Sequence, residues 1–269
     1  MNSEASSQVR GKKELVDIHS HILAGLDDGA RSWDESLAMV KMAAEAGTSD
    51  MVASPHANDR YAYDVEAVQA KVAELQEACG GVMRIHRGCD FHMSYGNIQE
   101  ALRKPARYTI NGGRYLLIEF SDMAIPPHMG AILEQMFGVG ITPIVTHPER
   151  NLILQKKLAM LAEWVDRDCL VQVTAGSFLG RFGKAAARAA DELMRRNLVH
   201  VVASDAHDTR YRTPALDVAY EHIVKQYGVS HAEAVLVRNP RAVVMGEAVD
   251  TARMPELERR VPWWRRLVR

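Results

Sequence analysis

The sequence is poor in cysteine, in charge of one sign and in long apolar runs, and each shortage argues against a class of protein. Its 269 residues include three cysteines, Cys79, Cys89 and Cys169, without Cys-x-x-Cys spacing. That pattern argues against disulfides and zinc knuckles and favours a reduced cytoplasm. The formal net charge of −1 leaves no basic field for nucleic acid. No run approaches the roughly 18 apolar residues that a membrane-spanning helix needs.

Two common phosphate chemistries also lack their residues. No Walker loop and no Gly-x-Gly-x-x-Gly element between a strand and a helix is present. A cysteine-dependent tyrosine phosphatase needs an arginine six positions after its cysteine, but Ile85, Tyr95 and Ala175 stand there. A thiolate nucleophile is therefore not expected.

The chain does contain short β-rich runs that alternate with helical patterns, which is typical of parallel β-α-β units. Strands are expected at Leu15–Ile18, Asp50–Ser54, Val82–Gly88, Tyr115–Phe120, Thr142–Thr146, Leu170–Val173 and Val199–Ser204. Helices are expected at Asp34–Ala46, Asp64–Ala78, Pro127–Phe137, Leu158–Arg167, Lys184–Arg196, Thr213–Tyr227, Ser230–Arg238 and Pro240–Glu247. Seven strand–helix units predict an α/β fold, a distorted (β/α)7 TIM-like barrel in a single domain. An open doubly wound sheet is the alternative.

The barrel is expected to span residues 15–248, after a polar leader at 1–14 that is expected to be disordered. Residues 249–269 form a basic tail with adjacent Trp263 and Trp264. Basic residues with tryptophans suit peripheral contact with an anionic membrane surface or an acidic partner. A plain solvated tail is the competing interpretation.

Histidines and acidic residues gather where the predicted strands end. His19 and His21 lie two residues apart in an extended segment, so both imidazoles point to the same side. The carboxyl ends of parallel strands meet at one face of a barrel, so strand-end residues should converge there. A carboxylate inside an apolar strand, such as Glu119, is costly unless it is paired or bound to metal. The other candidates are Asp27, Asp28, His56, Asp90, His147, Asp205 and His207.

Imidazole and carboxylate ligands together suit Mn²⁺, Fe²⁺ or Zn²⁺. So many candidates exceed what one ion needs, which implies two or three ions. His92 lies two residues beyond Asp90, so it could face the same cleft. The remaining histidines are expected to be surface or packing residues; they are His86, His128, His200, His222 and His231.

Several strings, in this order and spacing, resemble one known family. Residues 17–29 (DIHSHILAGLDDG) resemble the opening motif of the PHP (polymerase and histidinol phosphatase) superfamily, and within it the CpsB/CapC group of bacterial protein-tyrosine phosphatases, which includes YwqE. Matching strings follow at 54–56 (SPH), 117–120 (LIEF), 140–150 (GITPIVTHPER), 199–207 (VHVVASDAH) and 238–240 (RNP). The resemblance covers about residues 14–248.

The resemblance implies a TIM-like barrel with a trinuclear, usually manganese, centre. Its ligands would be His19, His21, Asp28, His56, Asp90, Glu119, His147, Asp205 and His207. Arg150 and Arg212 match arginines that bind phosphate in the family, and Arg210 is close enough in sequence to substitute for Arg212. The acid at position 90 is commonly Glu in the family, and Asp90 is one methylene shorter.

The resemblance also implies an activity, namely hydrolysis of phosphotyrosine by metal-bound hydroxide. Arg150 or Arg212 would neutralise the phosphoryl oxygens, and His56 or His207 would assist proton transfer. One alternative is a phosphatase for a small phosphoester such as histidinol phosphate. The other is a non-enzymatic metal-binding regulatory protein.

The family resemblance extends to partners. Family members act on the tyrosine-rich tail of a membrane-associated bacterial tyrosine kinase that controls capsule or exopolysaccharide synthesis. Some of them form homo-oligomers, for which the helix at residues 32–46 is a candidate surface.

Overall fold

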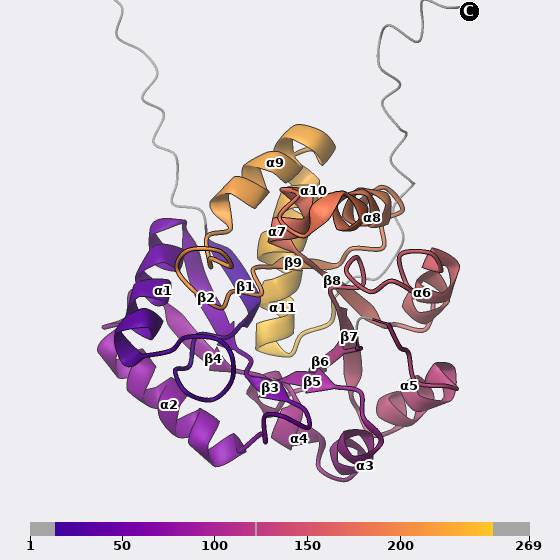
Figure 1. The fold of residues 1–269 in the computed structure, drawn as a ribbon, viewed down its shortest axis with the longest axis horizontal. Coiled ribbons are helices and arrows are strands. Elements are labelled where there is room, and N and C mark those ends of the chain that lie inside the picture. Colours follow the sequence, from indigo (N-terminus) through magenta and orange to yellow (C-terminus); the bar gives the residue numbers. More distant parts are fainter. Residues whose placement is uncertain (1–13, 122, 250–269) are drawn as a thin grey trace, which may run out of the picture.

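Parallel strands form a ring surrounded by helices in the computed structural model, which describes residues 14–121 and 123–249 (Figure 1). The strands are β1 (Leu15–Ser20), β2 (Thr48–Ala53), β3 (His56–Ala57), β4 (Arg84–Arg87), β5 (Asp90–His92), β6 (Tyr115–Glu119), β7 (Thr142–Thr146), β8 (Leu170–Thr174) and β9 (Val201–Ala203). They pair in the orders β1-β2-β4 and β3-β5-β6-β7-β8-β9, always in parallel.

Two of the ring's strands are broken in the middle. β3 resumes two residues after β2, beyond Ser54 and Pro55, and β5 resumes after β4, beyond Gly88 and Cys89. Pro55 has no N–H to donate to a neighbouring strand, which accounts for the first break. Counted once each, the broken strands leave seven strand positions, as the sequence predicts. The short second halves, β3 and β5, were not predicted.

The ring closes between β1 and β9. Ser20 and Ala206 form an isolated parallel bridge. The Asp205 N–H donates to the His19 carbonyl at 2.8 Å, and the His21 N–H donates to the Ala206 carbonyl at 2.8 Å. The sheet is therefore closed, and the alternative of an open doubly wound sheet is wrong.

The helices lie outside the ring, with one exception. They are α1 (Trp33–Glu45), α2 (Val65–Ala78), α3 (Tyr95–Arg103), α4 (Pro105–Tyr108), α5 (Met129–Gly138), α6 (Leu158–Val165), α7 (Ala175–Phe178), α8 (Gly183–Arg195), α9 (Asp217–Tyr227), α10 (Val229–Glu233) and α11 (Asn239–Met245), with short 3₁₀ and π turns at Ile110–Gly112 and Ala234–Arg238. The exception is α11, which crosses one end of the ring (Figure 1). Its Val243 and Val244 join the inner apolar cluster, alongside residues such as Val16, Leu117 and Ile144.

The predicted helices are present, with some bounds corrected. The helix expected from Thr213 begins only at Asp217, and the one expected over Ser230–Arg238 is split into α10 and a π turn. α3, α4 and α7 were not predicted. Ser32 caps the start of α1: its hydroxyl accepts the Glu35 N–H at 3.2 Å, while the Glu35 carboxylate accepts the Arg31 N–H.

The described elements run from Leu15 to Met245. The expected leader lies outside the described residues apart from Glu14, and the tail lies outside them apart from Val249, so both domain boundaries stay predictions. Within the described ranges, the helices are too short or too polar to cross a membrane.

Candidate metal centre

All nine predicted ligands converge at the end of the ring where the strands terminate. They fall into four overlapping groups, within each of which one ligand atom per residue lies within 4.8 Å of the others. The groups are His21, Asp28, His56 and His207; His19, Asp90 and His147; His19, His21 and Asp205; and His56, Asp90 and Glu119. The predicted convergence of residues far apart in sequence is therefore present in the structure.

His19, in β1, and His21, directly after it, are both held by their Nδ1 atoms. His19 Nδ1 lies 2.9 Å from the Gln172 side-chain oxygen, and His21 Nδ1 lies 2.6 Å from a carboxylate oxygen of Asp27. An oxygen acceptor at Nδ1 places the proton there and leaves Nε2 as the free ligand atom. The two Nε2 atoms face each other at 3.3 Å, and each lies 3.5 Å from Asp205 Oδ1.

The loop after β1 brings Asp28 over the cluster. Asp28 lies 3.4 Å from His56 and 3.6 Å from His207, and its side chain is 47% exposed. Gly29 lets the loop approach, because a Cβ there would lie 2.0 Å from the His21 carbonyl oxygen. The cluster thus meets solvent on the Asp28 side.

Asp90 takes part in two of the groups in spite of its shorter side chain. It lies 3.4 Å from His19 and 3.2 Å from His56 and is 1% exposed. Neither of its carboxylate oxygens, nor His56 Nδ1, has a partner in hydrogen-bond geometry within the described part of the chain. Buried polar atoms without such partners are expensive, and a cation between them would remove that cost.

Two of the strand-end ligands have an unusual backbone. His147 and Asp205 have φ angles of 34° and 53°, in the left-handed region that non-glycine residues rarely adopt. Each follows the end of a strand, β7 or β9, and the turn directs its side chain back over the ring. Strain of this kind collects at functional sites.

Electrostatics in the cluster follow from burial and close opposite charges. Burial and the Asp90 charge raise the pKa of Glu119. Burial would lower the pKa of His56, but contacts with Asp28 and Asp90 raise it to about 11. Burial and the neighbouring His21 lower the pKa of His207 to about 3. Asp28 and Asp90 thus favour the imidazolium form of His56, whose proton a bound divalent cation would displace.

Two arginines lie beside the cluster, and both contact Asp205. Arg150 and Arg212 donate to its Oδ2 atom, Arg212 at 2.5 Å, while Oδ1 faces His19 and His21. Of the two arginines that the sequence left open, Arg212 contacts the cluster, whereas Arg210 is exposed and its backbone N–H donates to Asp208. The Arg150 guanidinium lies 4.6 Å from the centre of the Phe182 ring.

Three supporting residues stay outside the metal-ligand groups of the described residues: Asp27, which the sequence offered as a candidate, and Gln172 and Glu149, to which it gave no role. Asp27 and Gln172 fix the β1 imidazoles, and the buried Glu149 accepts hydrogen bonds from the Ser177 hydroxyl at 2.7 Å and the Thr174 N–H at 3.1 Å. Burial raises the pKa of Glu149 to about 7. The sequence could have singled out Gln172, because it is a polar residue inside the apolar run Leu170–Val173.

Residues expected to be structural stay outside the four groups. His86, His128, His200, His222 and His231 are absent from the metal-ligand groups of the described residues. His92 does face the cluster, with Nδ1 3.9 Å from Glu119. All three cysteines are free, and burial raises the pKa of the Cys89 and Cys169 thiols, which argues against thiolate chemistry.

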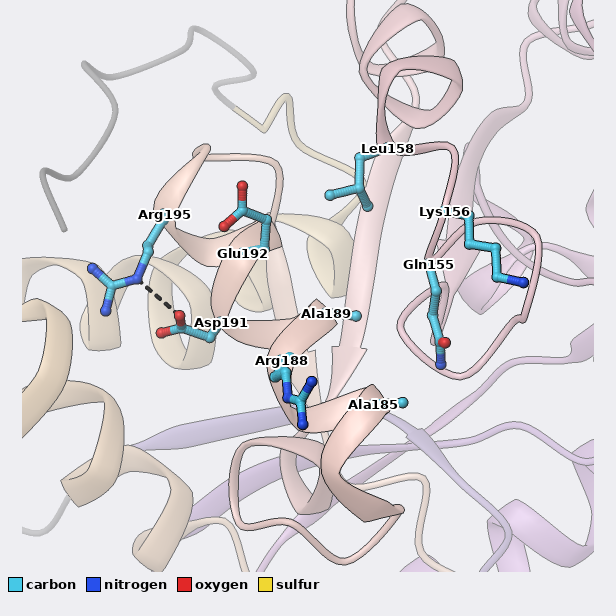
Figure 2. A pocket seen from close by; sticks show the side chains of 9 residues that line it. All are labelled: Gln155, Lys156, Leu158, Ala185, Arg188, Ala189, Asp191, Glu192 and Arg195. Carbon is cyan, nitrogen blue, oxygen red and sulfur yellow. Dashed lines mark hydrogen bonds and ion pairs between the residues drawn. The ribbon is translucent and has the colours of Figure 1, made fainter.

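A cavity of about 640 Å³ lies away from the nine predicted ligands, between α8 and the segment that leads into α6 (Figure 2). Arg188 and the Asp191–Arg195 ion pair line it, together with small apolar side chains of α8. None of the nine predicted ligands borders it. The predicted ligands therefore lie at the strand ends and not beside this cavity.

The donor set fits divalent cations. It combines imidazole nitrogens and carboxylate oxygens without thiolates, which suits borderline and hard ions such as Mn²⁺, Fe²⁺ and Zn²⁺. The unsatisfied oxygens of Asp90 and the facing Nε2 atoms of His19 and His21 lie where such ions would bind.

A family model described as capsular polysaccharide synthesis, CpsB/CapC, matches residues 15–245. The chain is similar to the tyrosine-protein phosphatase CpsB of Streptococcus pneumoniae, with 31% identity over 247 residues, which are 87% of this chain and 100% of that protein. It is also similar to the tyrosine-protein phosphatase YwqE of Bacillus subtilis, with 28% identity over 239 residues, which are 87% of this chain and 93% of that protein.

A solved structure resembles the whole fold. It comes from the crystal structures of YwqE from Bacillus subtilis and CpsB from Streptococcus pneumoniae, described as unique metal-dependent tyrosine phosphatases. It matches with a TM-score of 0.81 at 28% identity and covers 91% of this chain and 100% of that one.

Proposed function

This chain belongs to the CpsB/CapC family, and from that premise we propose that it is a metal-dependent protein-tyrosine phosphatase. One observation carries the proposal: nine imidazole and carboxylate side chains converge at the strand ends, directly beside Arg150 and Arg212. A cation cluster next to guanidinium groups is suited to a phosphate monoester dianion.

The proposed cofactor is Mn²⁺, two or three ions, with Fe²⁺ or Zn²⁺ as substitutes. The proposed ligands are the nine residues of the four groups. Bound there, the ions would supply Lewis-acid stabilisation of the phosphoryl oxygens and activation of water as the nucleophile. Asp27 and Gln172 would keep the β1 imidazoles in the tautomer that binds metal.

The chain's own residues would bind and orient the phosphate. Arg150 and Arg212 come from the loops after β7 and β9 and meet at one carboxylate oxygen of Asp205. A planar guanidinium fits two oxygens of a phosphate, so the pair would hold the phosphoryl group against the cluster. His56 or His207, which flank the half-exposed Asp28, would assist proton transfer during hydrolysis. A phenolate leaves readily, so weak acid assistance is enough.

The proposed substrate is the phosphotyrosine tail of a membrane-associated bacterial tyrosine kinase that regulates capsule or exopolysaccharide synthesis. The family's description as capsular polysaccharide synthesis supports it. The exposure of Asp28 also supports it, because a flexible peptide can reach a cluster that meets solvent. A cytoplasmic location follows from this substrate. Membrane contact through residues 249–269 and self-association through α1 stay predictions.

Hydrolysis assays test the proposal directly. Chelator-treated protein is assayed with a phosphotyrosine peptide and with histidinol phosphate, before and after addition of Mn²⁺. We expect no activity with chelator, and Mn²⁺-restored activity that prefers the peptide. Preference for histidinol phosphate would reassign the substrate to small phosphoesters. Full activity in chelator would refute metal dependence.

A further inference from the structure

The turn between α7 and α8 brings two adjacent side chains to the arginine pair. Gly180 and Gly183 adopt φ angles of +77° and +85°, which L side chains rarely adopt, and the Arg181 N–H donates to the Gly176 carbonyl at 2.9 Å. The turn is packed closely, since a Cβ at Gly176 would lie 3.1 Å from the Phe182 ring. Arg181 and Phe182 are therefore held in place by backbone geometry.

Phe182 lies against Arg150. The guanidinium carbon is 4.6 Å from the ring centroid, within the range of a cation–π contact, and the Arg150 side chain is 21% exposed. Phe182 itself is half-buried and belongs to neither apolar core cluster of the described residues. Packing in the core therefore does not account for an aromatic residue at this position.

Arg181 contacts both neighbours of Arg212. Its Nη1 atom donates to the Tyr211 carbonyl at 3.4 Å and to the Thr213 hydroxyl at 3.3 Å. These bonds tie the loop after β9 to the turn on either side of Arg212. The same turn thus contacts Arg150 through one residue and braces the Arg212 loop through the next.

We propose that Arg181 and Phe182 are positioning residues that set the separation of Arg150 and Arg212 to fit one phosphoryl group. The proposal rests on the proposed function, in which these two arginines bind phosphate. Neither positioning residue touches the reacting atoms. Their contribution is to restrict two long side chains before substrate arrives, which lowers the entropic cost of binding.

Substitution of Phe182 tests the cation–π half of the proposal. Mn²⁺-loaded full-length protein is titrated with inorganic phosphate in a calorimeter, and kcat and KM are measured on a phosphotyrosine peptide. We expect Phe182→Leu to weaken phosphate binding by about three- to tenfold, the range of a partly desolvated cation–π contact. Phe182→Tyr should restore binding, and bound metal should stay unchanged in both variants.

Phe178→Leu is the matched control. Phe178 lies four residues earlier, is 7% exposed and packs against His222 and Tyr227 instead of an arginine. This variant should lose thermal stability but keep the phosphate affinity of the wild type. Equal weakening of phosphate binding in Phe178→Leu and Phe182→Leu, or unchanged phosphate binding in Phe182→Leu, would overturn the proposal.

Arg181→Met tests the loop brace, because it keeps an unbranched side chain and removes the donors to Tyr211 and Thr213. We expect weaker phosphate binding, with partial recovery in Arg181→Lys. Unchanged affinity in Arg181→Met would overturn this half of the proposal.

The calorimetric readout separates this inference from the proposed function. If the wild type binds phosphate but hydrolyses no phosphotyrosine, the proposed function fails, and the affinities of the variants still decide the role of the turn. If the wild type binds no phosphate at all, the positioning proposal fails too.

Discussion

The two ends of the barrel each bury an aspartate held by arginine, yet they use it differently. At the end where the strands begin, Asp50 accepts two hydrogen bonds of 2.6 Å from Arg84 and further bonds from Ser49 and His86. At the other end, one carboxylate oxygen of Asp205 accepts hydrogen bonds from two arginines, and the second oxygen faces His19 and His21.

The two ends differ in how many of the buried carboxylate oxygens have hydrogen-bond donors from the protein itself. Both oxygens of Asp50 have donors from the chain, so the group is complete as a structural element. At the strand-terminating end, Asp205 Oδ1 faces imidazoles and Asp90 has no partner in hydrogen-bond geometry among the described residues. Buried carboxylate oxygens without donors from the protein are the feature by which the candidate metal centre differs from the structural ion pair at Asp50.

The largest effect, a loss of activity, is expected when the two aspartates are substituted in parallel. Asp205→Asn keeps the shape but removes the charge at the cluster, so kcat/KM on a phosphotyrosine peptide should fall by at least about 10²–10³-fold. Asp50→Asn should leave kcat/KM nearly unchanged and lower the free energy of unfolding by about 1–3 kcal/mol. Activity assays and urea unfolding of both variants check this. Equal losses of activity in the two variants would show that Asp50 and Asp205 do not differ in role.

A smaller effect is expected from the partners of the buried imidazoles. Asp27→Asn removes the carboxylate on His21, so Mn²⁺ affinity should fall by about 10–100-fold. His86→Gln removes the imidazole beside Asp50, at the end of the barrel where the strands begin. This variant should keep the Mn²⁺ affinity of the wild type. Mn²⁺ titration of the chelator-treated proteins measures both. A similar loss in both variants would mean that Asp27 acts through general stability.

The smallest effect concerns pH and the buried His200, which lies just before β9. Its Nδ1 accepts the Val171 N–H at 3.1 Å, and burial lowers its pKa from 6.5 to about 4. Between those values the unfolded chain binds a proton that the folded chain does not, so the free energy of unfolding falls as pH drops. From pH 7 to pH 5 this amounts to about 2 kcal/mol.

Urea unfolding at the two pH values, in wild type and in His200→Gln, isolates that contribution. The variant should lose about 2 kcal/mol less than the wild type over this interval. Identical losses would show that His200 does not carry this part of the pH dependence.

The ring and the convergence of the predicted ligands were predictable because both depend on local signals. Alternating strands and helices indicate a barrel, and a histidine or acid directly after a strand lies at the shared face whatever its distance in sequence. His19, His147 and Asp205 could be placed in this way, and Glu119 because it is a carboxylate inside an apolar strand. β3 and β5 were not predictable, because runs of two or three residues carry no periodicity.

The supporting residues depend on contacts that a single segment does not encode. Asp27 and Asp28 are adjacent acids, and only the course of the loop past Gly29 decides that one bonds His21 while the other lies over the cluster. α7 is four residues long, without an apolar stripe to predict it. The contact of Phe182 with Arg150 joins two distant loops, so only the folded chain reveals it.

The most direct test of the account is crystallographic. Crystals soaked in Mn²⁺ are measured above and below the manganese absorption edge, and the anomalous differences locate the bound ions. We expect two or three manganese peaks within coordination distance of the nine predicted ligands, between His19, His56, Asp90 and Asp205. Peaks confined to other parts of the surface, with none among these side chains, would contradict it.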